Sequence, residues 1–193
     1  MFKKMWMAGL AAFCALAFTF PAQSFASSNA YTVQEGDSIY KIAMENGVSA
    51  KQIQAINDKS DFSINAGEQL KLPEGVSEYE KDLLARLVEA EAQGENYSGK
   101  VAVATVVLNR VDSDIFPDTI HNVINDGIQF SPVLNGSINN PASEESKRAV
   151  NEALAYQGLD NGSLFFYNPD KAQSDYLESK EVITVIGNHV FMK

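Results

Sequence analysis

The sequence predicts an α+β protein made of two units that differ in character. A compact stretch over residues 31–73 shows the order strand, helix, helix, strand. From residue 79 onward, apolar stripes with helical spacing come first, and alternating β-type runs close the chain. The second unit is therefore expected to be mostly helical, with a small antiparallel sheet at its end.

Residues 1–26 have the layout of a secretory signal peptide. Two lysines precede an apolar run over residues 5–20, and small residues follow at Ser24 and Ala26. We expect cleavage after Ala26 and export of the remaining chain without a stable membrane anchor, because the run is short for a membrane span. The only cysteine, Cys14, would leave with this segment, so the mature chain would have neither a disulfide nor a cysteine nucleophile.

The composition is that of an ordinary globular protein with an acidic surface. The 193 residues are 45% hydrophobic and carry a formal net charge of -10. Binding to nucleic acid or to anionic lipid needs clusters of lysine and arginine, so neither partner is expected. With two histidines and no cysteine in the mature chain, no metal site and no cofactor are predicted.

The first unit begins with a strand pattern over residues 31–33 and ends with another over residues 69–72. Between them two helices are predicted, the first capped by Asp37 or Ser38 and the second by Ser49. The apolar residues expected on the inner faces of these helices are Ile39, Ile42, Ala43, Ile53 and Ile56.

The segments 31–43, 46–49, 56–57 and 64–73 resemble a LysM module over nearly its whole length. The resemblance implies that residues 31–73 bind glycans containing N-acetylglucosamine, in a shallow groove between two loops. Backbone amides and small residues can approach acetamido groups there without needing charge. Carried over to this sequence, the groove residues are Gly36, Asp37, Ser38, Ile39, Asn65, Ala66 and Gly67. Gly36 or Gly67 alone could simply be a turn glycine, so the prediction depends on the match of the whole pattern.

Residues 74–78 form a short polar linker, which predicts limited freedom between the two units. The second unit, residues 79–193, opens with a helix whose apolar stripe leads to Glu91. The next helix, with Ser98 as a possible cap, is almost wholly apolar over residues 101–108. Such a helix is typical of a core element that is buried on every side. The stripe of the opening helix consists of Leu83, Leu84, Leu87 and Val88.

The rest of the second unit predicts two more helices and the sheet. One helix is expected over residues 117–125, because a proline suits its first turn, and another follows a cap at Ser143. Strand patterns occupy residues 164–167 and 182–186. A tight turn then leads into residues 189–192, which are expected to pair antiparallel with the strand before them.

Glu91 is the residue most indicative of chemistry. A carboxylate on a core-facing stripe is costly to bury, and apolar walls raise its pKa by favouring the protonated form. A protonated glutamate is what a glycosidase needs to protonate the departing glycosidic oxygen. Glu89 points about 160° away on an ideal helix and is expected to be solvated. On pattern alone, Glu91 could equally well pair with a basic residue such as Arg110.

Several segments of the second unit, in order, resemble the SleB-type cell-wall hydrolases, the spore cortex-lytic enzymes and their relatives. These segments are 87–95, 99–104, 107–111, 129–131, 164–169 and 186–191. The resemblance implies a fold related to lysozyme-like transglycosylases, and cleavage of peptidoglycan between N-acetylmuramic acid and N-acetylglucosamine. The family's catalytic acid, the first glutamate of its Glu-Ala-x-Gly-Glu run, corresponds to Glu91.

The mechanism then divides into two possibilities. A hydrolase needs a second carboxylate, for which Glu95, Asp112 and Asp114 are the candidates, whereas a lytic transglycosylase needs one glutamate only. Because the sequence shows a single core-facing carboxylate, we favour the transglycosylase. An amidase is disfavoured by the lack of metal ligands, and a wall-binding protein without activity by the intact surroundings of Glu91.

Further polar residues in the family segments are candidates for binding the sugar, although each could instead serve turns, strand ends or helix contacts. They are Gln129, Ser131, Tyr167, Asn168, Thr105, Asn109 and His189. The sequence thus predicts a secreted enzyme associated with the cell wall or spore envelope, with peptidoglycan as its partner.

Overall fold

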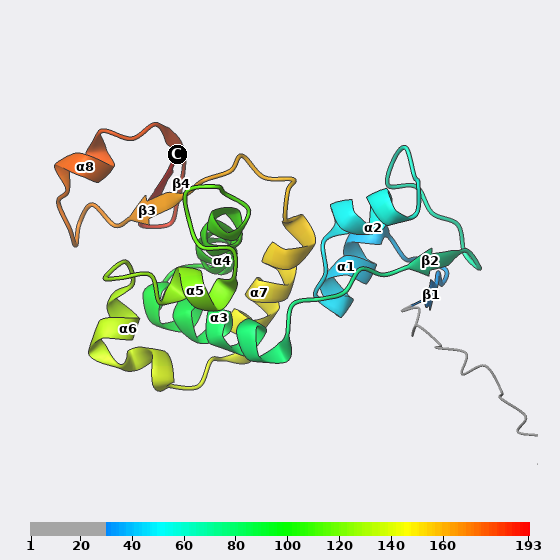
Figure 1. The fold of residues 1–193 in the computed structure, drawn as a ribbon, viewed down its shortest axis with the longest axis horizontal. Helices are drawn as coiled ribbons and strands as arrows, with labels where there is room; N and C mark the ends of the chain where they lie inside the picture. Colours follow the sequence, from blue (N-terminus) through cyan, green and yellow to red (C-terminus); the bar gives the residue numbers. More distant parts are fainter. Residues whose placement is uncertain (1–29) are drawn as a thin grey trace, which may run out of the picture.

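A computed structural model describes residues 30–193 (Figure 1). The predicted signal peptide falls on residues outside this range. The α+β class is confirmed, with a small two-stranded unit first and a helical domain with a three-stranded sheet after it. Over residues 30–193, no helix combines the length and hydropathy that crossing a bilayer would require.

The first unit has the predicted order of elements. These are β1 (Ala30–Thr32), α1 (Ile39–Asn46), α2 (Ala50–Ile56) and β2 (Gln69–Lys71). The two strands pair antiparallel, with Tyr31 opposite Leu70. Ser38 caps α1 and Ser49 caps α2, each accepting a hydrogen bond from a backbone amide of the first turn. One expectation was wrong: Ile56, the last residue of α2, is 39% exposed and does not belong to the core of the first unit.

The second unit packs its helices around α4. Its helices are α3 (Glu78–Glu91), α4 (Tyr97–Val111), α5 (Ile120–Ile124), α6 (Ser131–Asn135), the 3-10 turn η1 (Ser137–Asn139), α7 (Glu144–Tyr156) and α8 (Asp175–Glu178). The stripe of α3 and the apolar residues of α4 meet in one core, together with residues of α5 and α7. Figure 1 shows α3, α4 and α7 side by side, with the sheet at the end of the domain away from the first unit.

The sheet is antiparallel and has the order β3 (Phe165–Tyr167), β5 (His189–Met192), β4 (Val182–Ile186). The strand β5 is central, so Phe166 lies opposite Phe191 and Ile186 lies opposite His189. A register shift between Val182 and Thr184 adds a bulge to β4. The sheet packs on the helices through Phe191, which is 1% exposed.

Some predicted boundaries differ from the observed ones. The helix expected over residues 117–125 is only α5, because Thr119 caps it and leaves Pro117 in the preceding turn. Asn96, not Ser98, caps α4, since its side chain accepts a hydrogen bond from the Gly99 amide. The short helices α6 and α8 were not predicted, because four or five residues give little periodicity.

The two units touch directly along α1 and α7. The rings of Tyr40 and Tyr156 have centroids 4.7 Å apart, and Ala155 of α7 is part of the apolar core of the first unit. The hydroxyl of Ser49 donates to the carbonyl oxygen of Gln157 at 3.0 Å. The first unit is therefore docked on the second, beyond the covalent connection at residues 74–78.

Glu89 is not solvated as the sequence predicted. Its carboxylate accepts hydrogen bonds from the hydroxyls of Ser143 and Ser146 and from the Ser143 amide, at the start of α7. These bonds, with the Ser143 hydroxyl the strongest cause, lower the pKa of Glu89 despite partial burial. Glu89 thus ties the end of α3 to the N-terminus of α7, where a negative charge is favourable.

We expect Glu89→Gln to lower the free energy of unfolding by about 1–2 kcal/mol at neutral pH, because charge-assisted hydrogen bonds are lost. The folded-state pKa is depressed, so this stabilisation is present above the unfolded pKa and is lost as the pH falls through the folded pKa. Urea unfolding followed by circular dichroism at several pH values measures it. The exposed Glu35→Gln is the control. The assignment would be contradicted if the difference in unfolding free energy between wild type and Glu89→Gln did not shrink as the pH falls below about 4.

Candidate active site

A cleft of about 450 Å³ opens between the end of α3, the start of α6 and the sheet. Glu91, the last residue of α3, lies in its wall and is half-buried. The apolar stripe of α3 sets this position, because Leu87 and Val88 are fully buried one turn earlier. The carboxyl group of Glu91 therefore lies at the edge of the core.

Burial raises the pKa of Glu91 above its ordinary value. The backbone amide of Ser131 and the positive charge of Lys171 act in the opposite direction and offset part of the shift. A carboxyl group whose pKa is raised in this way holds its proton more readily than a solvated one and can give it to a bound molecule.

Glu91 is the only carboxylate in the cleft wall among residues 30–193. The side chain of Glu95 is 4% exposed and is turned toward the β4–β5 turn, where Asn188 donates to both of its oxygens. Asp112 accepts two hydrogen bonds from Gln157 near the first unit, and Asp114 is exposed. None of the three candidates for a second carboxylate reaches the cleft.

Arg110 forms the inner wall of the cleft and does not pair with Glu91. Its guanidinium donates to the carbonyl oxygen of Leu164 at 2.8 Å and to Oε1 of Gln129 at 2.7 Å. It also lies over three aromatic rings, with 4.8 Å to the nearest centroid, that of Phe116. Burial lowers the pKa of Arg110 to about 10, so the side chain remains charged at neutral pH.

Five of the predicted sugar-binding residues lie in the same cleft wall as Glu91. They are Gln129, Ser131, Tyr167, Asn168 and His189. Their elements explain the convergence, because Tyr167 on β3 pairs with Val190 on β5, beside His189. Asn168 is 8% exposed, and its Oδ1 accepts the Asp170 amide at 2.9 Å, which shapes the loop after β3.

Thr105 and Asn109 lie outside the cleft, contrary to the prediction. Asn109 donates to Asp160 at 2.7 Å and to the carbonyl oxygen of Ser163 at 3.1 Å, so it braces the chain that follows α7. Thr105 donates to the carbonyl oxygen of Val101 within α4 at 2.9 Å. They lie four residues apart on one face of α4, and neither lines the cleft.

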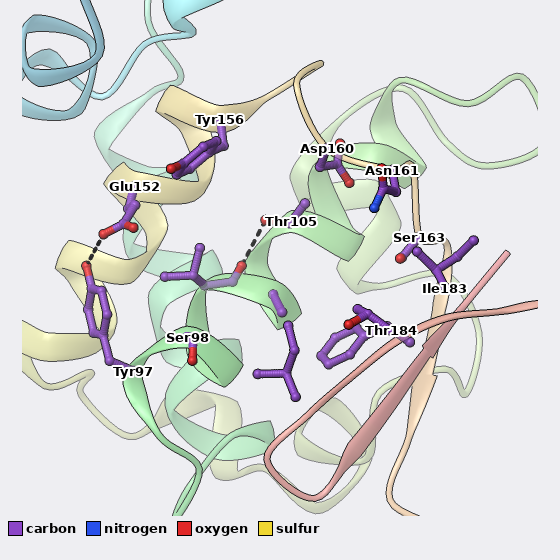
Figure 2. A pocket seen from close by; sticks show the side chains of 14 residues that line it. Tyr97, Ser98, Thr105, Glu152, Tyr156, Asp160, Asn161, Ser163, Ile183 and Thr184 are labelled. Carbon is purple, nitrogen blue, oxygen red and sulfur yellow. Dashed lines mark hydrogen bonds between the residues drawn. The ribbon is translucent and has the colours of Figure 1, made fainter. Parts of the chain in front are cut away.

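Thr105 instead lines a second hollow of about 310 Å³, between α4, α7 and β4 (Figure 2). Its walls are mostly apolar. Two carboxylates line this hollow, and both already accept hydrogen bonds. Glu152 accepts one from the Tyr97 hydroxyl at 2.7 Å, and Asp160 accepts one from the Asn109 side chain. The cleft at Glu91 is therefore the better candidate for acid–base chemistry.

Sequence reasoning missed several cleft residues. Lys171, Ile128 and Leu134 lie in its wall, and the last two are 81% and 62% exposed. No pattern marks them, because they sit in loops or in the short helix α6. Arg110 did carry a signal, namely a charge at the end of an otherwise apolar helix.

The two loops of the predicted LysM groove lie side by side. The amide of Gly67 donates to the carbonyl oxygen of Val33 at 2.8 Å, and the Val33 amide donates to the Glu68 carbonyl oxygen at 2.9 Å. Gly36 and Gly67 both have φ of 85°, and an added Cβ at either would meet nothing within 4 Å. The space in front of both glycines is open.

Three predicted groove residues have structural roles for their side chains. Ile39 is fully buried, and the carboxylate of Asp37 accepts hydrogen bonds from the Tyr31 hydroxyl, the Gln34 amide and Lys41. The hydroxyl of Ser38 caps α1. Contact with a glycan at this loop would therefore involve backbone groups, as the sequence predicts, and the exposed Ser38, and it stays a prediction.

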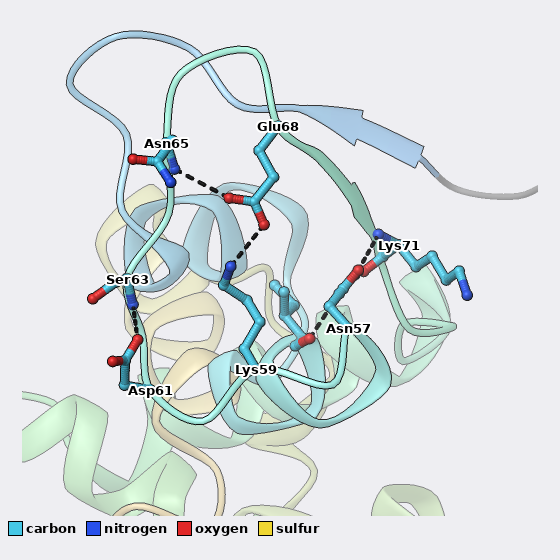
Figure 3. A network of polar contacts seen from close by, with 8 residues as sticks. Asn57, Lys59, Asp61, Ser63, Asn65, Glu68 and Lys71 are labelled. Carbon is cyan, nitrogen blue, oxygen red and sulfur yellow. Dashed lines mark hydrogen bonds and ion pairs between the residues drawn. The ribbon is translucent and has the colours of Figure 1, made fainter.

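The second loop of the groove is braced from within (Figure 3). Glu68 pairs with Lys59 at 2.7 Å and accepts the Asn65 amide at 3.1 Å. Asn57 bridges the end of α2 to β2, because it exchanges two hydrogen bonds with the backbone of Lys71. These contacts hold Asn65, Ala66 and Gly67 in place without using the Asn65 side chain.

In the part of the chain that the structure describes, no group of three or more histidine, cysteine, aspartate or glutamate side chains is placed to hold a metal ion.

Comparison with known families gives two matches. The model of the cell wall hydrolase family matches residues 94–192, and that of the LysM domain matches residues 31–73. The first match begins three residues after Glu91, so it does not bear on that glutamate.

Curated relatives are the spore cortex-lytic enzymes of Halalkalibacterium halodurans, 39% identical over 134 residues, and of Oceanobacillus iheyensis, 37% identical over 124 residues. These matches cover 69% and 64% of this chain, but only 41% and 45% of the relatives. The chain thus spans less than half the length of these proteins.

Two solved structures are similar to the second unit. The catalytic domain of the germination-specific lytic transglycosylase SleB from Bacillus anthracis is 39% identical, with a TM-score of 0.58, and the match covers 63% of this chain and 99% of that one. The catalytic domain of the Bacillus cereus SleB protein is 40% identical, with a TM-score of 0.57, over 63% of this chain and 94% of that one.

We expect Lys171→Met to raise the pKa of Glu91 further, because a positive charge that favours the carboxylate is removed. Carbon NMR of protein labelled at glutamate measures the titration, and Glu91→Gln assigns the signal. The matched control is Lys71→Met on the exposed face of β2. An unchanged or lower pKa in Lys171→Met would show that this charge does not act on Glu91.

Proposed function

The chain belongs to the cell wall hydrolase family, and on this basis we propose that it cleaves the glycan strands of peptidoglycan between N-acetylmuramic acid and N-acetylglucosamine, with Glu91 as the catalytic acid. The observation that carries the proposal is the half-buried carboxyl of Glu91, alone in the cleft wall among the described residues, with its pKa raised by burial.

The single carboxylate favours a lytic transglycosylase. In the first step Glu91 gives its proton to the glycosidic oxygen, and the bond between that oxygen and C1 of the muramoyl residue breaks. In the second step the Glu91 carboxylate takes the proton of the same sugar's 6-hydroxyl, whose oxygen bonds to C1 and closes a 1,6-anhydro ring. Glu91 is protonated again at the end, and no water is consumed.

Hydrolysis is the alternative reaction. Inverting enzymes place a second carboxyl group about 6.5–9.5 Å from the first to activate water, and retaining enzymes place one about 5–5.5 Å away as a nucleophile. Glu95, Asp112 and Asp114 all lie outside the cleft wall, which is why we favour the anhydro product.

Beside the charged groups of the cleft, four neutral polar side chains offer hydrogen bonds that suit a sugar. Gln129, Ser131, Tyr167 and Asn168 supply amide and hydroxyl groups around Glu91, as expected for contacts to hydroxyl and acetamido groups. The exposed side chains of Ile128 and Leu134 at the rim can cover the apolar faces of sugar rings. These roles are part of the proposal.

The LysM domain is proposed to anchor the protein to the same polymer. Its open groove at Gly36 and Gly67 offers backbone groups to acetamido groups, so a net negative protein can hold an anionic wall without matching charges. Residues 31–73 would be the binding domain, 74–78 the linker and 79–193 the catalytic domain, after export and removal of residues 1–26. The names of the curated relatives favour spore cortex as the substrate.

We expect Glu91→Gln to lower the rate of glycan cleavage by about 10²–10⁴, the usual contribution of general acid–base catalysis. Mass spectrometry of digested cortex and vegetative peptidoglycan identifies the products. Anhydromuramic ends indicate a transglycosylase, reducing ends a hydrolase and freed peptides an amidase. Glu89→Gln, two residues away on the same helix, is the matched control. Full activity in Glu91→Gln would refute the central assignment.

Ala66→Glu is expected to weaken binding to insoluble peptidoglycan by about tenfold or more, because it places a bulky negative charge in the open groove. Cleavage of soluble fragments should be unaffected. Sedimentation with purified wall measures binding, and Ser60→Glu, exposed on the same connection between α2 and β2, controls for added charge. Equal binding by both variants and wild type would reject the anchoring groove.

A further inference from the structure

Glu95 and His189 form a buried contact directly behind the cleft. Their side chains are 4% and 8% exposed, and Nδ1 of His189 lies 3.5 Å from Oε1 of Glu95. Glu95 belongs to the connection between α3 and α4, whereas His189 is the first residue of β5. Only His189 lines the cleft that contains Glu91. A carboxylate is costly to bury, so hydrogen bonds and nearby charges must offset the desolvation of Glu95.

The turn between β4 and β5 is built around the Glu95 carboxylate. The backbone amide of Asn188 donates to Oε2 at 3.0 Å, and Nδ2 of Asn188 donates to Oε1 at 3.0 Å. Gly187 has φ of 59°, and a Cβ at this position would collide with Oε2 of Glu95. A side chain there would have to displace the Glu95 carboxylate, and the bonds from Asn188 tie Glu95 to the residue just before β5 and His189.

The charges of the pair are settled by their surroundings. Desolvation acts to raise the pKa of Glu95, but the two hydrogen bonds from Asn188, with the nearby His189 and Lys171, outweigh it and lower the pKa. Burial lowers the pKa of His189, Lys171 adds to this effect and Glu95 opposes it. At neutral pH an ionised carboxylate thus lies beside a neutral imidazole.

A neutral imidazole carries one N–H, and a carboxylate beside one ring nitrogen holds the proton there. In this protein that nitrogen is Nδ1, which makes no hydrogen bond among the described residues, and the nearby carboxylate is that of Glu95, with Oε1 3.5 Å away. The rings of Phe166 and Phe191, with centroids 5.4 Å and 6.2 Å from that of His189, pack against the imidazole edge-on. The two rings restrict the orientation of the imidazole, and a proton on Nδ1 would leave Nε2 free to accept a hydrogen bond.

We propose that Glu95 is a positioning residue that holds His189 in its Nδ1-protonated form, so that Nε2 of His189 accepts a hydrogen bond from a hydroxyl group of the glycan bound at Glu91. The inference rests on the proposed function, because it places a glycan in the cleft. His189 transfers no proton in this scheme, and Glu91 remains the only acid and base. The charged groups around the imidazole are Glu95 behind it and Glu91, Arg110 and Lys171 in the cleft wall.

The first test needs no substrate. The sequence has only two histidines, so nitrogen NMR of histidine-labelled protein gives two sets of signals, and His121→Gln assigns them. We expect His189 to be neutral and protonated on Nδ1 at pH 7. In Glu95→Gln, which removes the charge opposing desolvation, its pKa should fall further and the preference for Nδ1 should weaken. A proton on Nε2 in the wild type, or no change in Glu95→Gln, would overturn the positioning role.

The second test is kinetic and uses soluble glycan fragments. We expect Glu95→Gln to lower kcat by about tenfold with KM little changed, since one hydrogen bond in the reacting complex loses its orientation. His189→Gln, which places an amide near the position of Nε2, should retain more activity than His189→Asn, whose amide sits near that of Nδ1. Activity should fall on the acid side as His189 gains a proton and loses its acceptor.

Glu89→Gln is the matched control, because it neutralises another partly buried glutamate near the end of α3 that accepts structural hydrogen bonds. It should lower stability without changing the His189 tautomer or kcat. Wild-type kcat in Glu95→Gln, or equal activity of the two His189 variants, would overturn the hydroxyl contact. A wild-type protein that cuts no glycan would overturn the proposed function, and the NMR result would still decide the role of Glu95.

Discussion

The burial of the apolar stripe of α3 is the constraint on which the rest of the second unit depends. Leu84, Leu87 and Val88 have no exposed surface, so the helix cannot rotate or slide without opening the core. Its last turn is thereby held where the core ends and the cleft begins. A carboxyl group at that point is neither fully solvated nor fully enclosed, which is the condition under which burial shifts its pKa while leaving it reachable.

Three glutamates close together in the sequence show how surroundings assign different states to one residue type. Glu89 meets serine hydroxyls and a helix N-terminus, and its pKa is lowered. Glu91 meets apolar walls, and its pKa is raised. Glu95 has a side chain that is 4% exposed, yet the two bonds from Asn188 help to lower its pKa and keep it ionised. Hydrogen-bond donors decide the charge of a buried carboxylate as much as the depth of burial does.

Much of this architecture could be predicted from the sequence, because periodicity and capping residues report on long elements. The caps at Ser49 and Ser143, the stripe of α3 and the strands β4 and β5 are of this kind. The surroundings of Glu89 could not be predicted, since its partners lie 54 residues or more further along the chain. The same limit hid Lys171, which reaches the cleft from a loop whose course depends on Asn168.

The residues of the site divide in a similar way. Those next to the strands, such as Tyr167 and His189, were placed in the cleft by the sheet register, which the alternating pattern indicates. Thr105 and Asn109 were predicted to line the cleft but do not. A polar pair on an apolar helix indicates that one helix face differs from the rest, but it does not indicate which neighbouring segment packs against that face. Here the neighbour is the chain after α7 and the second hollow.

The contact between α1 and α7 has a consequence for how the protein would work on a long polymer. With Tyr40 against Tyr156 and Ala155 inside the core of the first unit, the proposed binding and catalytic domains pack against each other and are not joined by the linker alone. In this arrangement the Glu91 cleft would reach only glycosidic bonds at a fixed distance from the sugars bound at the LysM groove. The lengths of the released glycan fragments would then depend on the distance between these two sites as well as on the chemistry of the peptidoglycan.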